Sequence, residues 1–463
     1  MRVSRLKLAG FRNYSELEFL PGDGINILHG RNAQGKSNVL EAISLLATTR
    51  SLRAGRESEL INKEAEEAHV TADVAREREG DASLQVSVFQ GDKKAVRVNG
   101  LKRSRVVDLL GEFNAVFFGS IDIPIVTGEP STRRHYLNIE ISQISPRYVY
   151  DLGHYKRVLE QRNRLLKDLR DRPRPVQETG LDAWNEQLVQ FGAPIIEKRR
   201  FYIDRLAPIA DRIHQDLTEG KEHLAITYLS SVSLESPEPP AVQEDHGAVY
   251  SNLNDEYNDT STGLGACRKH GPFGPGSAGA AGATTTIAEQ FQNQLQALAY
   301  DEARRGTTLL GPQRDDVAFL IDGVEARVYG SQGQQRTVAL SLKLAEFQLI
   351  EEFVGEPPVL LLDDVMSDLD DLRRRRLLKW LERRCQSFIT CTNLRSFPTE
   401  ILAVAAKFHV SAGTVTRDVE LQTGTKVGGG RRPSKSLGST NNCAAAESTG
   451  NTDTADVASG LPP

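Results

Sequence analysis

The sequence predicts an α/β fold with a mixed sheet and a second, helical lobe. Residues 30–37 form a glycine-rich loop between an apolar run (residues 24–29) and an amphipathic pattern (residues 37–46), the order of strand, loop and helix. Residues 359–364 are four apolar residues followed by two carboxylates, which is typical of a buried parallel strand. Residues 331–336 precede a long helical run, and a helix of that length must pack on a sheet or on other helices.

Bulk composition excludes several classes of protein. Hydrophobic residues make up 39% of the 463 residues and charged residues 26%, as in a soluble protein with a core. No apolar run is long enough to cross a bilayer and no signal peptide is visible, so we expect no membrane role. The four cysteines suit neither a zinc site nor a disulfide framework, which favours the cytoplasm. A net charge of −5 excludes a generally basic nucleic-acid binder, so any DNA contact must come from local patches.

Patterning along the chain predicts four parts. Residues 1–135 hold the N-terminal part of the sheet lobe. Residues 136–310 form a helical lobe, with a helix that starts at Ser145-Pro146, where Ser is the N-cap and Pro the first helical residue. The second long helix of that lobe is expected to bend or break near Pro194 and Pro208. Residues 311–423 complete the sheet lobe. Residues 231–285 and 424–463 are rich in Gly, Pro, Ser and Thr, and we expect a disordered insertion and tail there.

The glycine-rich loop reads G-x-x-x-x-G-K-S, which predicts a phosphate-binding loop for ATP. Its glycines let backbone N–H groups approach phosphates, Lys36 reaches the β- and γ-phosphates, and Ser37 holds Mg²⁺. The alternative is a chance match, which the flanking strand and helix argue against. The residues expected at the nucleotide are Gly30, Arg31, Asn32, Ala33, Gln34, Gly35, Lys36 and Ser37.

The acidic end of the second strand predicts the metal-holding half of the same site. Asp363 would hold Mg²⁺ through water, and Asp364 stands where a base would orient the attacking water. Asp is shorter than Glu, so we expect slow turnover. Lys36, Asp363 and Asp364 are therefore the candidate catalytic residues. The alternative is a buried strand with a solvated acidic turn.

The turn before the long helix predicts a second anion site. A small Ser331 and Gly333 at a helix N-terminus suit a phosphate, and Gln334 belongs to the same turn. Because the chain already has one phosphate loop, this turn suits the nucleotide of a partner subunit in an ATP-dependent homodimer. The alternative is an ordinary N-capped helix.

Basic residues near a predicted hairpin at Asn99-Gly100 are candidates for contacts with the DNA backbone. A solvated edge strand is the alternative reading. The candidates are Arg50, Arg53, Lys102, Arg103 and Arg105.

Seven segments together resemble the RecF family of bacterial DNA repair proteins. Beside the three motifs above, they are residues 8–14, residues 128–134 (G-E-P-S-T-R-R), residues 161–167 (Q-R-N-R-L-L-K) and residues 311–316 (G-P-Q-R-D-D). Gln313 stands where the family has His, and residues 119–122 depart from the family pattern, which puts any role of that loop in doubt.

The resemblance implies a head domain like those of SMC-type and ABC-type ATPases, a P-loop NTPase fold in which two subunits sandwich two ATP molecules. It also implies ATP-dependent binding to single-stranded or gapped DNA, weak DNA-stimulated ATP hydrolysis, and loading of RecA with RecO and RecR in repair, replication and the SOS response.

Three other functions share these motifs. The ATP-binding subunit of a transporter is usually shorter and lacks segments such as residues 128–134 and 311–316. A true SMC protein separates its motifs by long heptad coils, which the Pro- and Gly-rich insertion forbids. A scaffold that binds ATP without hydrolysing it remains open, given the short Asp364.

Overall fold

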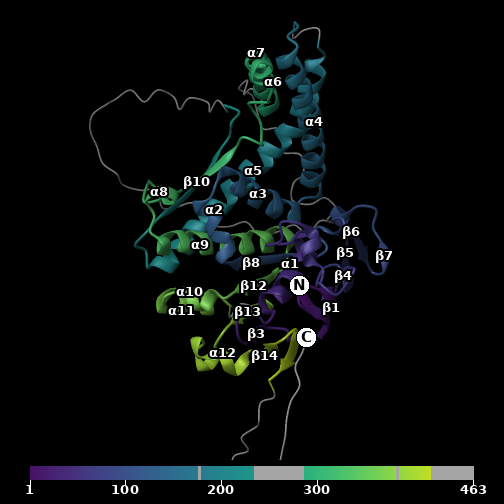
Figure 1. Ribbon diagram of the computed structural model, residues 1–463. Coiled ribbons are helices and arrows are strands. Elements are labelled where there is room, and N and C mark those ends of the chain that lie inside the picture. Colours follow the sequence, from purple (N-terminus) through teal and green to yellow (C-terminus); the bar gives the residue numbers. More distant parts are fainter. Residues whose placement is uncertain (176–178, 234–285, 382–384, 419–463) are drawn as a thin grey trace, which may run out of the picture. The chain divides into compact units, whose positions relative to one another are not determined.

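A computed structural model describes residues 1–175, 179–233, 286–381 and 385–418, and Met1–Asp418 form one compact unit (Figure 1). The expected tail at 424–463 and all but the first three residues of the expected insertion lie outside the described residues. Among the helices described, none is both long and apolar enough to span a membrane.

A six-stranded mixed sheet holds both motif-bearing strands. Its order is β15 (Thr414–Arg417), β14 (Ala406–Ser411), β3 (Ile25–His29), β13 (Ser387–Cys391), β12 (Val359–Asp363) and β8 (Ala115–Gly119). All neighbouring pairs are parallel except β14 and β15. The apolar part of β12 is fully buried, so its prediction as a buried parallel strand is confirmed.

Two helices cover the two faces of this sheet. Leu360 and Leu362 of β12 belong to the core that includes α9 (Gln332–Val354), whereas Val359 and Leu361 belong to the core that includes α1 (Lys36–Thr48). Successive strand residues point to opposite faces, so a strand buried on both faces needs an unbroken apolar run.

An antiparallel sheet packs on the other side of α1 (Figure 1). Its order is β2 (Tyr14–Phe19), β1 (Arg2–Phe11), β4 (Glu67–Ala75), β5 (Ala82–Phe89), β6 (Lys93–Val98) and β7 (Leu101–Lys102). The hairpin at Asn99-Gly100 is confirmed, with φ of 52° and 75° at the two turn residues. The preceding strands β5 and β6 form a hairpin of their own, because Gly91 and Asp92 turn the chain with positive φ.

The helical lobe is built on α4 (Pro146–Asp171) and α5 (Leu181–Thr218). Ser145 caps α4 as expected, since its side chain accepts the N–H of Tyr148 at 3.2 Å. The helix α5 runs unbroken through Pro194 and Pro208, so the prediction of a break at these prolines is wrong. Tertiary packing along α5, which is buried against α4 and α9, outweighs the lost backbone hydrogen bonds.

A three-stranded sheet joins the two sides of the insertion, and the sequence analysis missed it. Strand β9 (Leu224–Leu229) pairs with β10 (Asp316–Ile321), which pairs with β11 (Val324–Glu325). Beyond β9, Val232 is fully buried and the N–H of Ser231 donates to Asp315 Oδ1 at 2.7 Å. The expectation of disorder is therefore wrong for residues 231–233.

The remaining helices connect these parts. They are α2 (Ile123–Thr127), α3 (Pro130–Ile144), α6 (Ile287–Ala297), α7 (Ala299–Arg305), α8 (Ala326–Tyr329), α10 (Val365–Asp368), α11 (Asp371–Leu381) and α12 (Thr399–Val404), with the 3₁₀ turns η1 (Glu57–Leu60), η2 (Val106–Leu109), η3 (Ser120–Asp122) and η5 (Leu394–Ser396). The expected boundary after residue 135 lies inside α3, and the division into parts stays a prediction.

A buried ion pair ties the helical lobe together. Arg162 on α4 and Glu302 on α7 are both fully buried and 2.5 Å apart. The other guanidinium nitrogens of Arg162 donate to Asn185 Oδ1 at 2.9 Å and Thr308 Oγ1 at 2.7 Å. Through Arg162, the segment at residues 161–167 thus contributes to packing inside the helical lobe.

The segments at residues 128–134 and 311–316 meet at the base of the lobe. Arg133 contacts both carboxylate oxygens of Asp316, at 2.6 and 2.9 Å, and Arg134 donates to Asp315 O at 2.9 Å. Gln313 accepts the hydroxyl of Tyr155 and donates to Leu310 O at 2.7 Å. These contacts give both segments a structural role.

Arg162→Ala should lower the free energy of unfolding by about 3–5 kcal/mol, because it leaves Glu302 buried and unpaired. Arg164→Ala on the same helix is the matched control, since Arg164 and Glu160 form an exposed pair worth less than about 1 kcal/mol. Urea denaturation followed by circular dichroism measures both. Equal losses in the two variants would contradict a special role for the buried pair.

Candidate nucleotide-binding site

The loop between β3 and α1 depends on two glycines. Gly30 has φ of 150°, and a Cβ there would lie 2.3 Å from Val410 O. Gly35 has φ of 113°, and a Cβ there would lie 2.8 Å from the hydroxyl of Tyr14. Because no side chain fits at either position, the loop backbone can wrap closely ahead of the N-terminus of α1, as an anion site requires.

Lys36, the first residue of α1, lies back over this loop. Its ammonium donates to Gly30 O at 2.8 Å and Arg31 O at 2.9 Å, and the residue is buried. Burial lowers the pKa of Lys36, while Asp364 and Asp363 act in the opposite direction. The loop thus contains a cation, tethered only by carbonyl groups, at the place where phosphates would enter.

Ser37 and Asp363 meet although 326 residues separate them. Ser37 Oγ donates to Asp363 Oδ1 at 2.7 Å, and Thr390 Oγ1 donates to the same oxygen at 2.8 Å. The register of the sheet causes this, since Asp363 pairs with Thr390 at the carboxyl ends of β12 and β13. Hydroxyl and carboxylate oxygens are the ligands that Mg²⁺ prefers, so this set of residues fits that ion.

Asp364 follows at the strand end, in a left-handed conformation with φ of 53°. Its backbone N–H donates to Thr390 Oγ1 at 2.8 Å, and the residue is exposed. Thr390 therefore positions both acidic residues, and the sequence analysis missed it. A polar residue ending the neighbouring parallel strand was the available signal.

Gln34 anchors the rest of the loop. Its Oε1 accepts the N–H of Ala412 at 2.8 Å, and its carbonyl accepts Asn13 Nδ2 at 3.0 Å. Arg31, Asn32 and Ala33 are exposed at the tip.

Ser331 is the N-cap of α9, so the expected helix N-terminus at this turn is present. Its Oγ accepts the N–H of Gln334 at 3.3 Å, while its own N–H donates to Gln334 Oε1 at 2.9 Å. Gln334 Nε2 also donates to Glu222 Oε1 at 3.0 Å, and a Cβ at Gly333 would lie 4.0 Å from Ser331 Oγ, an ordinary van der Waals contact. Figure 1 shows α8, which directly precedes this turn, well apart from α1. Within the described chain, Ser331, Gly333 and Gln334 are thus not brought to the phosphate loop.

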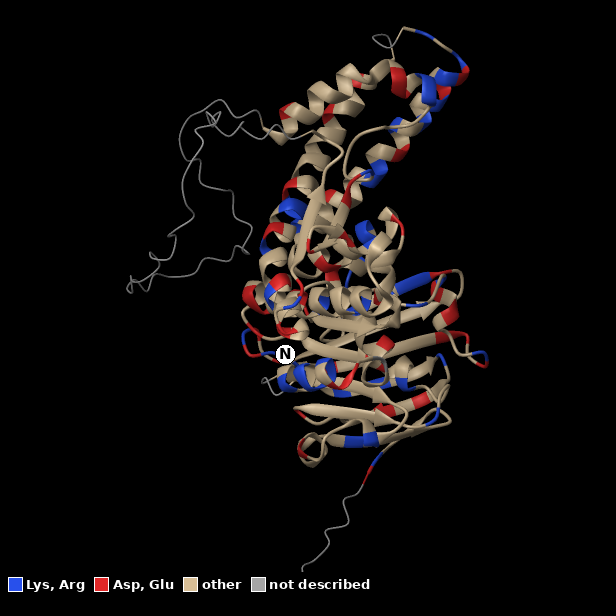
Figure 2. Cartoon of the chain, turned by 90° about the vertical axis from the view of Figure 1, so that its left-hand side faces the viewer, with Lys and Arg blue, Asp and Glu red and all other residues tan. Residues whose placement is uncertain are grey.

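The candidate DNA contacts fall into three places. Lys102, Arg103 and Arg105 are exposed at the hairpin, and Arg105 pairs with Asp108 at 2.8 Å. Arg50 is exposed after α1, whereas Arg53 contacts Asp363 Oδ2 and so lies at the nucleotide site. On the face in Figure 2, Lys and Arg are interspersed with Asp and Glu.

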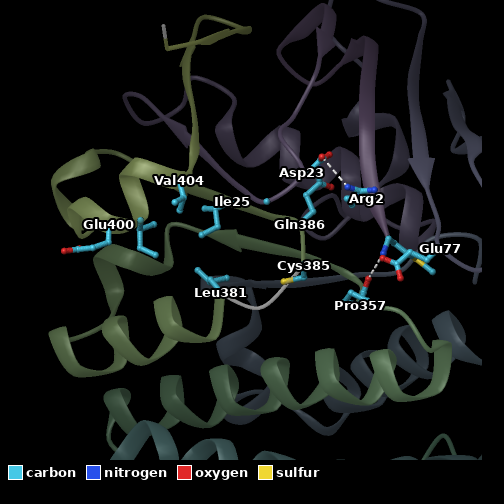
Figure 3. Close-up of a pocket in the computed structure, with 13 residues that line it drawn as sticks. Arg2, Asp23, Ile25, Glu77, Pro357, Leu381, Cys385, Gln386, Glu400 and Val404 are labelled. Atoms are coloured by element: carbon cyan, nitrogen blue, oxygen red, sulfur yellow. Dashed lines mark hydrogen bonds and ion pairs between the residues drawn. The ribbon is translucent and has the colours of Figure 1, made fainter. Parts of the chain in front are cut away.

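A pocket of about 670 Å³ lies elsewhere (Figure 3). Arg2, Asp23, Leu381 and Glu400 are among its lining residues, and none of residues 30–37 lines it. It is separate from the candidate nucleotide site.

Comparison with known proteins agrees with this geometry. The family model described as the RecF/RecN/SMC N terminal domain matches residues 2–409. The DNA replication and repair protein RecF of Halalkalibacterium halodurans is 38% identical over 417 residues, which cover 90% of this chain and 100% of the relative. The chain belongs to the RecF family. Its counterpart in Symbiobacterium thermophilum is 39% identical over 420 residues, covering 90% of this chain and 99% of that RecF.

Solved RecF structures share the fold. The recombination mediator protein RecF in the RecFOR pathway, solved as RecF-ATP and as RecF-ATPrS, is 33% identical to the chain in both cases. The TM-scores are 0.73 and 0.72, with 90% of this chain and 97% and 98% of those chains covered. The predicted fold class, a P-loop ATPase of the ABC/SMC head type with a helical lobe, is confirmed.

Thr390→Val should weaken Mg²⁺–ATP binding about tenfold, because it removes the hydroxyl that orients Asp363 and leaves the N–H of Asp364 unpaired. Thr390→Ser keeps the hydroxyl and should bind within about threefold of the unmodified chain. Titration of a fluorescent ATP analogue in Mg²⁺ measures both. Unchanged affinity in Thr390→Val would show that Thr390 does not position the carboxylates.

Proposed function

We propose that the chain is an ATP-dependent DNA-binding protein of DNA replication and repair, and that it binds Mg²⁺–ATP at residues 30–37 and Asp363. The observation that carries the proposal is the 2.7 Å contact between Ser37 and Asp363 beside the ammonium of Lys36. The ATP-bound state of a solved RecF that is 33% identical supports it.

Each residue then has a distinct task. Lys36 would exchange its two loop carbonyls for phosphate oxygens, which are stronger acceptors for an ammonium group. Ser37 and Asp363 would hold Mg²⁺, which would supply positive charge against the negative charge of the phosphates. Asp364 would orient the attacking water, with its backbone fixed by Thr390.

Closure by a second copy of the chain would complete this site. Ser331 and Gly333 are exposed and Gln334 is half-buried at a helix N-terminus that lies apart from α1, so this turn suits the γ-phosphate on a partner subunit. ADP lacks that phosphate, and a ligand shifts an equilibrium only through contacts that differ between the two states.

Membership of the RecF family supports a wider role. We propose cytoplasmic action on single-stranded or gapped DNA, loading RecA together with RecO and RecR during repair and the SOS response. A solved relative is described as a recombination mediator in the RecFOR pathway, which supports this role. The division into residues 1–135, 136–310 and 311–423 remains part of the proposal.

A scaffold that binds ATP without turning it over is the second candidate. The short side chain of Asp364 and its exposure favour it. Hydrolysis measured with and without DNA separates a weak, DNA-stimulated ATPase from this scaffold. A transporter subunit is disfavoured, because the chain belongs to the RecF family.

Lys36→Ala should abolish ATP binding by removing the charge that phosphates require. Lys36→Met keeps the buried stem and should fail equally, which separates charge from packing. Titration with a fluorescent ATP analogue measures both, and thermal unfolding checks that the variants are folded. Normal affinity in either variant would refute the assigned site.

Ser331→Arg should leave ATP binding near normal while abolishing ATP-dependent dimerisation and hydrolysis, because a bulky cation blocks contact with the partner's nucleotide. Ser331→Thr keeps both cap and hydroxyl and should dimerise. Asp364→Asn should hold the ATP-bound dimer without turnover. Light scattering with ATP and with ADP tests all three, and a Ser331→Arg chain that still dimerises would refute closure in trans.

A further inference from the structure

Three basic side chains line a group of neighbouring hollows at the end of α1 and along α3 and α4. Arg50 and His135 line a cleft of about 450 Å³ together with Lys156. Arg50 and His135 also line a cavity of about 120 Å³ that lies next to it. His135 and Lys156 continue into a further pocket of about 230 Å³.

These three side chains lack counter-ions. In the described part of the chain, none of Arg50, His135 and Lys156 takes part in an ion pair, although each is exposed. Their basic neighbours are already satisfied. Lys94 contacts Glu57 and Thr49 O, both at 2.6 Å, and Arg199 donates to Pro312 O at 2.6 Å.

The three groups disfavour one another's charge. Burial lowers the pKa of His135, and Arg50 and Lys156 lower it further. Burial also lowers the pKa of Lys156, and Arg50 and Arg199 add to that effect. A bound anion would relieve this repulsion.

Neutral groups in the cleft also suit an anion. Asn138 lines two of the hollows, and its Oδ1 already accepts Tyr148 OH at 2.8 Å and Arg199 at 2.9 Å. That leaves its amide nitrogen as a donor. The hydroxyl of Ser142 is a further donor in the wall of the cleft.

The surroundings indicate which anion belongs here. Val106 and Val107 line the cleft directly after the basic hairpin with Lys102, Arg103 and Arg105. A strand whose backbone tracks along the hairpin would therefore reach the cleft. A hollow of this size accepts a small ligand and not a duplex, so it suits one backbone unit.

We propose that this cleft seats a backbone phosphate of DNA, with Arg50, His135 and Lys156 contacting its oxygens. The proposal rests on the proposed DNA-binding function and assigns it a specific site. Contacts with backbone phosphates position a protein on DNA. Such contacts need cations that have no other partner, and here these cations line a hollow beside a basic hairpin.

Proton uptake should accompany this binding. The charged groups acting on His135 are Arg50 from the loop after α1, Lys156 on α4 and Glu140 on α3; the other charged residues lining the hollows are Glu57, Asp92, Lys94, Asp122, Arg134, Arg199 and Lys343. Without an anion the lowered pKa keeps His135 neutral near neutral pH. A phosphate raises that pKa, so DNA affinity should rise as the pH falls through this range.

The test compares the unmodified full chain, a double variant and a control variant, all with ATP. Arg50→Gln/Lys156→Gln removes the two permanent cations, and Arg157→Gln, one residue along α4 on an exposed position outside the cleft, is the matched control. Fluorescence anisotropy with gapped DNA gives affinity against salt concentration, and thermal unfolding verifies the fold of each variant.

The double variant should bind about tenfold more weakly, with the salt slope reduced by about one unit, while Arg157→Gln behaves as the unmodified chain. Equal loss in Arg157→Gln, or no loss in the double variant, would overturn the cleft and leave the proposed function intact. If the unmodified chain with ATP fails to bind DNA at all, both proposals fall.

A pH series tests His135 separately. His135→Gln should lose the gain in affinity between about pH 8 and pH 6 that the unmodified chain shows. An unchanged pH dependence in His135→Gln would overturn the assignment of His135 to the phosphate.

Discussion

The parallel strand β12 is the constraint on which the rest of the structure depends. Each face of this strand lies in a different core, so one helix must cover each face of the sheet. Those helices are α1 and α9, and each begins at a turn suited to an anion. Burial of the four apolar residues of β12 thus places the glycine-rich loop on one side of the sheet and the Ser331 turn on the other. Both turns suit an anion, because a helix N-terminus leaves backbone N–H groups unpaired.

The same strand delivers the acidic residues to the loop. A parallel register aligns the carboxyl ends of β3, β13 and β12 at one edge, where Ser37, Thr390 and Asp363 form hydrogen bonds. The segments at residues 128–134, 161–167 and 311–316 serve another purpose. Arg133 and Arg162 are buried, and their contacts with Asp316 and Glu302 hold the helical lobe in place.

Local patterns predicted much of this fold. The Asn99-Gly100 hairpin and the helix start at Ser145 depend on neighbouring residues, and both were confirmed. Contacts set by tertiary packing were beyond the sequence. The pairing of β9 with β10 spans the insertion, Thr390 reaches Asp363 only through sheet register, and α5 passes two prolines because its packing holds it. The sequence also does not show which partner a long basic side chain contacts. Arg53 was expected to contact DNA, and in the structure it contacts Asp363.

One short loop connects the candidate nucleotide site with the proposed DNA cleft. Arg53 contacts the carboxylate of Asp363, and Arg50, three residues earlier, lines the cleft beside α3 and α4. A cation entering at Asp363 competes with Arg53 for the same oxygens, since a carboxylate has few acceptor positions. Releasing Arg53 changes the constraints on the segment that carries Arg50. If the loop holds different positions with and without nucleotide, the affinities of the two sites must be linked in both directions, because coupling between binding sites is reciprocal.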